Sequence, residues 1–192
     1  MAEIVVPVVY FDKPGPQNTA RTLEAARQRA EALGVRAILV ASTTGETGVR
    51  AAEVFRGYEV VVVTHSTGMR APNTQELLPE HRAAIEAAGG HILTCQHAFG
   101  GVNRAVRRKL NTYLTDEIIA YTLRTFGEGM KVCLEIALMA ADAGLVRVDQ
   151  PAIAIAGTGR GADTAVLLVP ANAQDFFDLR VMELIAKPRL EP

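Results

Sequence analysis

Short apolar runs, separated by polar loops and amphipathic stretches, recur along the whole chain. Residues 37–41 and 60–63 contain only Ala, Ile, Leu and Val. Neither run alternates polar with apolar residues, so both are typical of parallel strands that are buried on two faces. Further β-favouring runs cover residues 4–10, 91–94, 152–156, 165–169 and 181–186. The pattern predicts a sheet that is built from these runs.

Amphipathic or strongly apolar segments lie between the runs and predict helices. The first begins at Asn18 or Thr19, either of which can cap it, and ends at Gly34. The others are expected at 49–55, 79–88, 103–110, 115–126 and 131–143. Strands that alternate with helices predict an α/β fold, a three-layer α/β/α sandwich with a mainly parallel sheet. The runs at 152–156 and 165–169 are joined by a short glycine loop, which favours an antiparallel pairing.

Composition and charge narrow the classes of function. The 192 residues are 49% hydrophobic and 21% charged, with a net charge of −1, and no linker or repeat divides them, so we expect a single domain over residues 1–192. No basic stripe is interleaved with aromatic residues, so we expect no nucleic-acid partner. The basic cluster from Arg104 to Lys109 is interpreted as a solvated helix face in preference to a binding patch. No leader pattern and no apolar run of membrane-spanning length is present, so we expect a cytoplasmic protein with no membrane partner.

The cysteines and histidines show no metal-binding spacing. Cys95 and Cys133 lie far apart in apolar contexts and are interpreted as reduced core thiols. No H-x-x-x-H or C-x-x-C pair is present, so we expect no metal site.

The loop from Ser42 to Gly48 is the strongest candidate for ligand binding. It places four hydroxyl side chains and two glycines where a helix begins. Free N–H groups and the positive end of the helix dipole favour an anion there, phosphate above all. The alternative is that Ser42 or a neighbouring Thr only caps the helix. We favour a phosphate site.

Three other polar loops follow predicted strands, at residues 64–68, 96–101 and 157–164. Ligands of open α/β sheets bind outside the carboxyl ends of the strands, so these loops are expected to line one pocket. With Lys13 as a possible charge partner, the candidate binding residues are Lys13, Ser42, Thr43, Thr44, Gly45, Thr47, Thr64, His65, Thr67, Gly68, Gln96, His97, Arg160, Gly161, Asp163 and Thr164.

The last of these loops matches a dinucleotide fingerprint only in its letters. Gly157-x-Gly159-x-x-Ala162 follows a predicted strand, but β-favouring residues and Pro170 come next where a helix is required. A Rossmann site is therefore rejected. A structural hairpin loop and a ligand role for Arg160 and Asp163 both remain open.

Catalytic residues are not identified by the sequence, and Glu135 and His97 are candidates only. Lys131, Glu135 and Asp142 form a stripe on an apolar helix, which we interpret as a narrow solvated face. If the stripe is covered, Glu135 becomes a buried carboxylate and a candidate acid or base. His65 and His97 lie at strand ends, where a hydrogen-bonded loop residue is the favoured interpretation over a catalyst.

The loop Ser42-x-Thr44-Gly45-x-Thr47 resembles the effector-phosphate loop in the C-terminal domain of pyruvate kinase. That loop has the pattern Thr-x-Ser-Gly-x-Ser/Thr followed by Ala, where this chain has Gly48. Nearly the whole chain also resembles a stand-alone family with the pyruvate kinase C-terminal-domain-like fold. The segments that carry this resemblance are Tyr10-Phe11-x-Lys13-Pro14-Gly15 with Asn18-Thr19, Val40-Ala41-Ser42, Lys131-Val132-Cys133-x-Glu135-Ile136 with Met139-Ala140-Ala141-Asp142, and Arg160-Gly161-Ala162-Asp163-Thr164-Ala165.

The resemblance implies an α/β/α fold with a core sheet of about five strands, one of them antiparallel, and extra helices. It also implies bound flavin mononucleotide (FMN) in some members, and it implies no reaction. This sequence does not contain the catalytic barrel of pyruvate kinase, so kinase activity is not transferred.

The expected function is therefore the binding of a phosphate-bearing small molecule, with FMN as the expected cofactor. Ser42, Thr44, Gly45 and Thr47 would take the phosphate, and Lys13 and Arg160 are possible charge partners. Candidates for an apolar slot around the flavin ring are Tyr10, Phe11, Phe99 and Met139. The alternative is a regulatory or sensor domain that binds a sugar phosphate. A homo-oligomer is compatible with either function.

Overall fold

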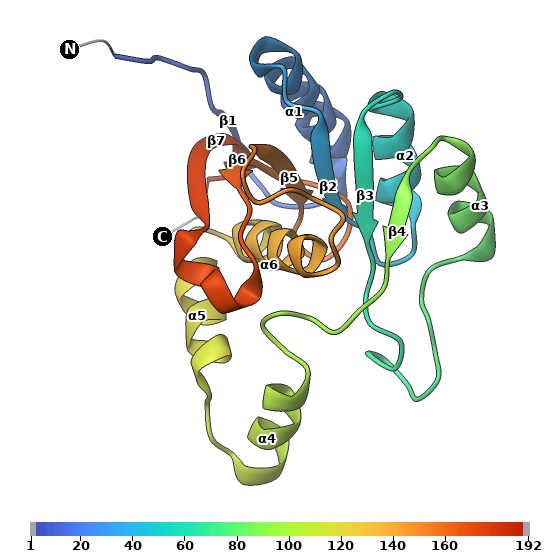
Figure 1. Cartoon of the computed structure of the whole chain (residues 1–192), viewed down its shortest axis with the longest axis vertical. Helices are drawn as coiled ribbons and strands as arrows, with labels where there is room; N and C mark the ends of the chain where they lie inside the picture. Colours follow the sequence, from blue (N-terminus) through green and yellow to red (C-terminus); the bar gives the residue numbers. More distant parts are fainter. Residues whose placement is uncertain (1–2, 190–192) are drawn as a thin grey trace.

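A seven-stranded sheet crosses the centre of the molecule in the computed structural model, which describes residues 3–189 (Figure 1). Its strands are β1 (Val9–Phe11), β2 (Ala37–Ala41), β3 (Glu59–Val63), β4 (His91–Leu93), β5 (Ala152–Ala156), β6 (Thr164–Val169) and β7 (Arg180–Pro188). They lie in the order β1-β7-β6-β5-β2-β3-β4. All seven β-favouring runs of the sequence therefore contribute a strand.

The sheet is mainly parallel and contains one antiparallel strand, as predicted. β6 runs antiparallel to both of its neighbours, β5 and β7, and every other pairing is parallel. The predicted α/β class and the antiparallel pairing of β5 with β6 are thus confirmed. The sheet is wider than about five strands because β7 and β1 extend it beyond β6.

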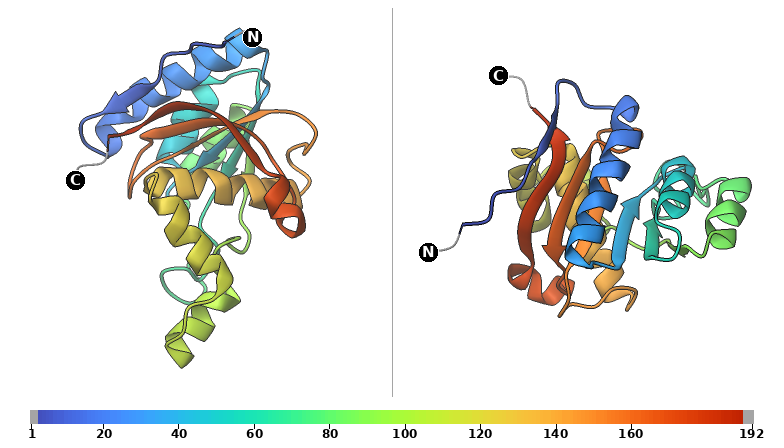
Figure 2. Two further views of the ribbon diagram at one scale, coloured as in Figure 1. Left: turned by 90° about the vertical axis from the view of Figure 1, so that its left-hand side faces the viewer. Right: turned by 90° about the horizontal axis from the view of Figure 1, so that it is seen from above.

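Helices cover both faces of the sheet (Figure 2). On one face lie α1 (Thr19–Leu33), α2 (Glu46–Val54) and, beyond it, α3 (Pro79–Ala87); on the other lie α6 (Glu128–Asp142) and α5 (Thr115–Arg124), which packs on α6. In β2, Ile38 and Val40 face the first layer, whereas Leu39 faces α6. This division explains why the strands are apolar at every position.

Two helix boundaries show how local chemistry sets the elements. α1 ends at Gly34, which has the left-handed conformation (φ 69°) that glycine adopts without strain, as predicted. α2 begins at Glu46, earlier than the predicted start at residue 49. The reason is that Gly45 turns the chain with φ 100°, so Thr47 and Gly48 already belong to the helix.

The N-terminal strand is shorter than the run at 4–10 that predicted it. Only Val9 to Phe11 pair with β7, at the edge of the sheet. Pro7 lacks an N–H group and cannot donate to a ladder, which is consistent with the late start.

Two remaining features bear on the sequence predictions. Cys133 is a buried free thiol, as expected, whereas Cys95 is only partly buried. No helix within residues 3–189 is long and apolar enough to cross a membrane.

The helix α4 (Val102–Leu110) projects with α5 away from the sheet (Figures 1 and 2).

Candidate functional site

Four loops leave the sheet at one edge. β5, β2, β3 and β4 are adjacent and parallel, so their carboxyl ends lie side by side. The loops that follow them comprise residues 42–45, 64–68, 94–101 and 157–163, which we call the carboxyl rim. Most of the predicted binding residues are therefore brought to one edge of the molecule.

The N-terminus of α2 is the part of the rim best suited to an anion. The Ser42 hydroxyl accepts a hydrogen bond from the Gly48 N–H at 3.0 Å, which is the capping role considered above. The N–H groups of Thr43, Thr44, Gly45, Glu46 and Thr47 have no hydrogen-bond partner within the described residues. Consecutive unpaired N–H groups at a helix N-terminus are a typical phosphate-binding arrangement.

Gly45 is required by packing as well as by its backbone conformation. A Cβ at this position would lie 2.4 Å from the Cβ of His81 and 2.7 Å from a methyl group of Leu77. The Thr44 carbonyl accepts hydrogen bonds from the Leu78 N–H and from the ring of His81. The start of α3 thus fixes this loop through Leu78 and His81.

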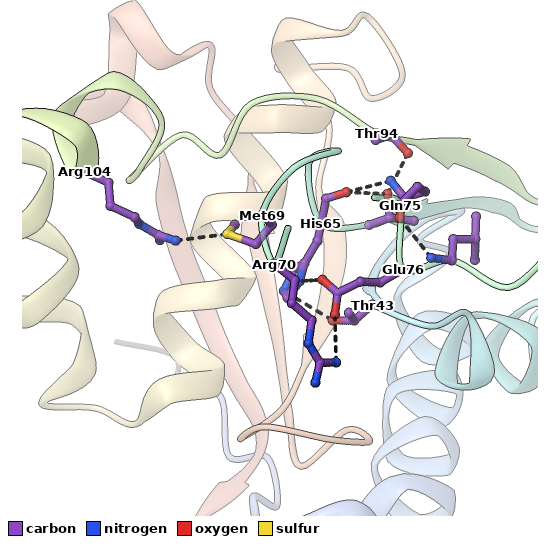
Figure 3. A network of polar contacts seen from close by, with 10 residues as sticks. Thr43, His65, Met69, Arg70, Gln75, Glu76, Thr94 and Arg104 are labelled. Atoms are coloured by element: carbon purple, nitrogen blue, oxygen red, sulfur yellow. Dashed lines mark hydrogen bonds and ion pairs between the residues drawn. The ribbon is translucent and has the colours of Figure 1, made fainter. Parts of the chain in front are cut away.

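The loop after β3 carries a network around His65 (Figure 3). The Nδ1 atom of His65 lies 2.8 Å from a carboxylate oxygen of Glu76, and its Nε2 atom lies 3.3 Å from the Thr43 hydroxyl. Arg70 lies 3.9 Å from the same carboxylate group. His65 therefore links the rim loops after β2 and β3.

His97, in the loop after β4, lies close to His65. Their ring centroids are 5.5 Å apart, and the rings meet edge to face. The Nδ1 atom of His97 is 3.5 Å from an oxygen of Glu135, and its Nε2 atom is buried with no hydrogen-bond partner among residues 3–189. Each histidine thus turns Nδ1 toward a carboxylate, a geometry that favours a proton on Nδ1 and leaves Nε2 as an acceptor.

Glu135 is buried, which contradicts the interpretation of its helix stripe as a solvated face. Only 2% of Glu135 and 6% of Lys131 are exposed, although Asp142 is exposed. Glu135 accepts hydrogen bonds from the Lys131 ammonium at 2.6 Å and from the Phe99 N–H at 3.1 Å. The loop after β4 folds over this part of α6 and covers the stripe.

The environment of Glu135 keeps its carboxylate charged. Burial alone would raise its pKa, but the hydrogen bond to His97 and the charge of Lys131 outweigh burial and lower the pKa to about 2. A carboxylate with so low a pKa is a poor proton donor or acceptor near neutral pH. Of the two catalytic candidates, Glu135 is therefore the charged partner of His97 and Lys131.

The loop between β5 and β6 is held mainly by structural contacts. Asp163 is fully buried, and its carboxylate accepts hydrogen bonds from the Gly15 and Thr158 N–H groups and from the Thr164 hydroxyl. A Cβ at Gly161 would lie 2.5 Å from the Pro16 Cα. These contacts explain Gly161, Asp163 and Thr164 without a ligand.

Two of the predicted charge partners are exposed near this loop. Arg160 lies at its tip, and Lys13 lies in the segment that contacts it through Gly15. Both remain accessible to a ligand at the rim. Thr67, Gly68 and Gln96 are also exposed in rim loops, whereas the Thr64 hydroxyl is buried and bonds to Thr94 at 2.6 Å.

The predicted apolar slot is not assembled. Phe11 and the exposed Tyr10 lie on β1, which is separated from β2 by β7, β6 and β5. Four strand spacings amount to about 19 Å. Phe99 and Met139 are buried in the core on the α6 side. The four side chains therefore do not surround one ligand.

Sequence reasoning missed Glu76 and did not assign a role to Lys131. Glu76 lies in a segment without periodicity, so no pattern could have paired it with His65. Lys131 carried a signal, its i,i+4 spacing to Glu135, but spacing alone does not distinguish a buried pair from a solvated one.

Comparison with known protein families agrees with this architecture. The family model described as "Pyruvate kinase, alpha/beta domain" matches residues 20–169, which include β2 to β6 and the helices between them. The match covers most of the chain and includes the α2 N-terminus, His97 and Glu135. The chain therefore belongs to the pyruvate kinase alpha/beta domain family.

Proposed function

We propose that the chain binds a phosphate-bearing small molecule at the carboxyl rim, with FMN as the first candidate. The observation that carries the proposal is the row of unpaired N–H groups from Thr43 to Thr47 at the N-terminus of α2. The hydroxyl groups of Thr43 and Thr44 lie beside them on residues that are not buried. Together these groups supply the donors that a phosphate dianion requires.

The residues of the rim fit the phosphate end of FMN. His65, Gln96 and His97 in the neighbouring loops are available to contact the rest of the molecule. Flavin, when bound, supplies redox chemistry through its ring system. Because no slot is assembled from Tyr10, Phe11, Phe99 and Met139, the ring would have to be held by rim residues.

A sugar phosphate is the second candidate. The observation in its favour is that the rim loops near α2 are lined by polar side chains, among them His65 and the exposed Gln96. Sugar hydroxyls suit such a lining, and a sugar phosphate uses the same phosphate-binding N–H groups.

Within either proposal, His97 is the group placed to move a proton. Glu135 lies on its Nδ1 side, and the buried Nε2 atom, which has no partner among residues 3–189, becomes usable when the loop after β4 shifts to admit a ligand. Lys131 keeps Glu135 charged, so both residues act by positioning the imidazole.

Thr44 offers a direct test of the phosphate site, because its side chain is exposed at the start of α2. Thr44→Glu adds a negative charge beside the N–H groups, and Thr44→Gln adds a neutral side chain of the same length. We expect FMN affinity, measured by flavin fluorescence quenching, to fall at least tenfold in Thr44→Glu and about twofold or less in Thr44→Gln.

The colour of the purified protein separates the two candidates. A yellow protein that releases flavin on denaturation supports FMN. A colourless protein whose melting temperature rises with a sugar phosphate but not with FMN supports the second candidate. Equal FMN binding by both Thr44 variants would place the phosphate elsewhere.

A further inference from the structure

A polar cavity lies between α4 and α5, away from the N-terminus of α2. Its volume is about 180 Å³, and four arginines, Arg104, Arg107, Arg108 and Arg124, line it together with Glu117 and Tyr121. Cavities that hold drug-sized ligands are larger, so this cavity suits a small molecule. No residue of α4 is buried, in line with the solvated helix face predicted for residues 104–109, but its arginines also border this hollow.

The charges around this cavity are not balanced. Arg107 pairs with Glu117, and Arg124 pairs with Glu128. Arg104 and Arg108 have no carboxylate partner within residues 3–189. The guanidinium of Arg104 instead contacts the sulfur of Met69 at 3.0 Å, which leaves its charge uncompensated (Figure 3).

The two unpaired guanidinium groups, those of Arg104 and Arg108, give the hollow an excess of positive charge that an anion would balance. Guanidinium groups bind phosphate and carboxylate oxygens through paired N–H donors. The excess of positive charge therefore indicates an anionic ligand.

Glu117 adds a second requirement. It is 8% exposed, and one of its carboxylate oxygens, Oε2, is buried with no hydrogen-bond partner among the described residues. A buried carboxylate oxygen requires a donor, and a fully deprotonated anion offers none. A ligand that carries a hydroxyl group next to its anionic group satisfies both Glu117 and the arginines.

We propose that this cavity is a second anion site, which binds a hydroxylated phosphate ester. Arg104 and Arg108 neutralise the phosphate, and Glu117 accepts a hydrogen bond from the hydroxyl group. Tyr121, which is half-exposed, lines the cavity. The site is formed by α4 and α5 together with Phe99 of the rim loop 94–101, but it shares no residue with the N–H row of α2, so its occupancy can be tested separately from the function proposed above.

The absence of tryptophan from the sequence gives this site a specific reporter. Tyr121→Trp places the sole indole of the protein in the cavity wall. We expect the fluorescence of this variant to change and saturate when glycerol 3-phosphate is added. Methyl phosphate, which lacks the hydroxyl groups, should bind about tenfold more weakly.

Charge-removing variants in the same background test the arginines. Arg104→Gln with Arg108→Gln should weaken glycerol 3-phosphate binding by at least tenfold. Lys109→Gln, which removes a charge from an exposed neighbour outside the cavity, should change it less than threefold. Thr44→Glu should leave this titration unchanged, because it alters only the α2 site.

Three outcomes would overturn the proposal. One is a fluorescence that does not respond to glycerol 3-phosphate, and another is equal loss of binding in the Lys109 and arginine variants. The third is equal affinity for methyl phosphate and glycerol 3-phosphate, which would remove the role of Glu117.

Discussion

At the scale of single residues, the carboxylate of Glu135 is buried and has a partner on each of three sides. It holds Lys131, the Phe99 N–H and His97 around one buried point. Only 7% of the Lys131 side chain is exposed. Each charge is therefore tolerated because the other is present.

Removing only one charge of this pair should be costly. We expect Glu135→Leu to lower the free energy of unfolding by about 3–5 kcal/mol, because Lys131 is left charged and buried without a partner. Lys131→Met combined with Glu135→Leu replaces the pair by apolar side chains of similar size and should recover part of that loss, since the Phe99 N–H still loses its acceptor. Urea unfolding of the two variants measures the difference. A single variant as stable as the parent protein would contradict the pairing.

At the scale of elements, the entry into α2 is shaped by its contact with α3. Gly45 has a positive φ and lies against His81 and Leu77. The same glycine starts the helix whose free N–H groups form the proposed phosphate site. Packing and binding thus make separate demands on one short turn.

Two glycines with positive φ allow the cost of packing against α3 to be separated from the cost of backbone strain. Gly45→Ala should lower the free energy of unfolding by roughly 2–4 kcal/mol, from backbone strain plus overpacking against α3. Gly34→Ala carries only the strain, because nothing lies within 4 Å of its Cβ position, and should cost about 1 kcal/mol. Thermal or urea unfolding compares them, and equal costs would show that α3 yields to the added methyl group.

At the scale of the whole molecule, buried charge couples stability to pH. Glu135 has a pKa of about 2 in the folded protein, below its ordinary value of 4.5. Its contribution is therefore fully present above pH 4.5 and is lost as the pH falls through 2. The hydrogen bond to Arg29 also lowers the pKa of Glu183 on β7. The contacts of Glu135 with His97 and of Glu183 with Arg29 therefore both weaken in acid.

Acid unfolding should therefore depend on the Lys131–Glu135 pair. We expect the free energy of unfolding to fall by about 3 kcal/mol on account of Glu135 between pH 4.5 and about pH 2. The variant with Lys131→Met and Glu135→Leu should show a shallower fall, with the part due to Glu183 retained. Urea unfolding across this range of pH measures both, and identical pH profiles would rule out the assigned role of Glu135.

Local patterns by themselves determined the layers of this protein. The Val-rich run of β3 predicted a strand that is buried on two faces, and Gly34 predicted the end of α1. Both depend on neighbours within a few residues, because hydrophobic period and backbone conformation are local properties. The parallel strand ends that follow from this pattern also predicted that the loops after β2, β3, β4 and β5 share one edge.

Only the tertiary structure decided what covers each polar residue. The stripe of Lys131 and Glu135 has the same spacing whether water or protein lies over it, and here the loop at 97–99 lies over it. Tyr10 and Phe11 looked available to a flavin until the strand order placed β1 far from β2. The arginines of α4 line a cavity only because α5 provides the opposite wall, with Glu117, Tyr121 and Arg124. Burial, strand order and the meeting of distant charges are long-range properties, and no local pattern contains them.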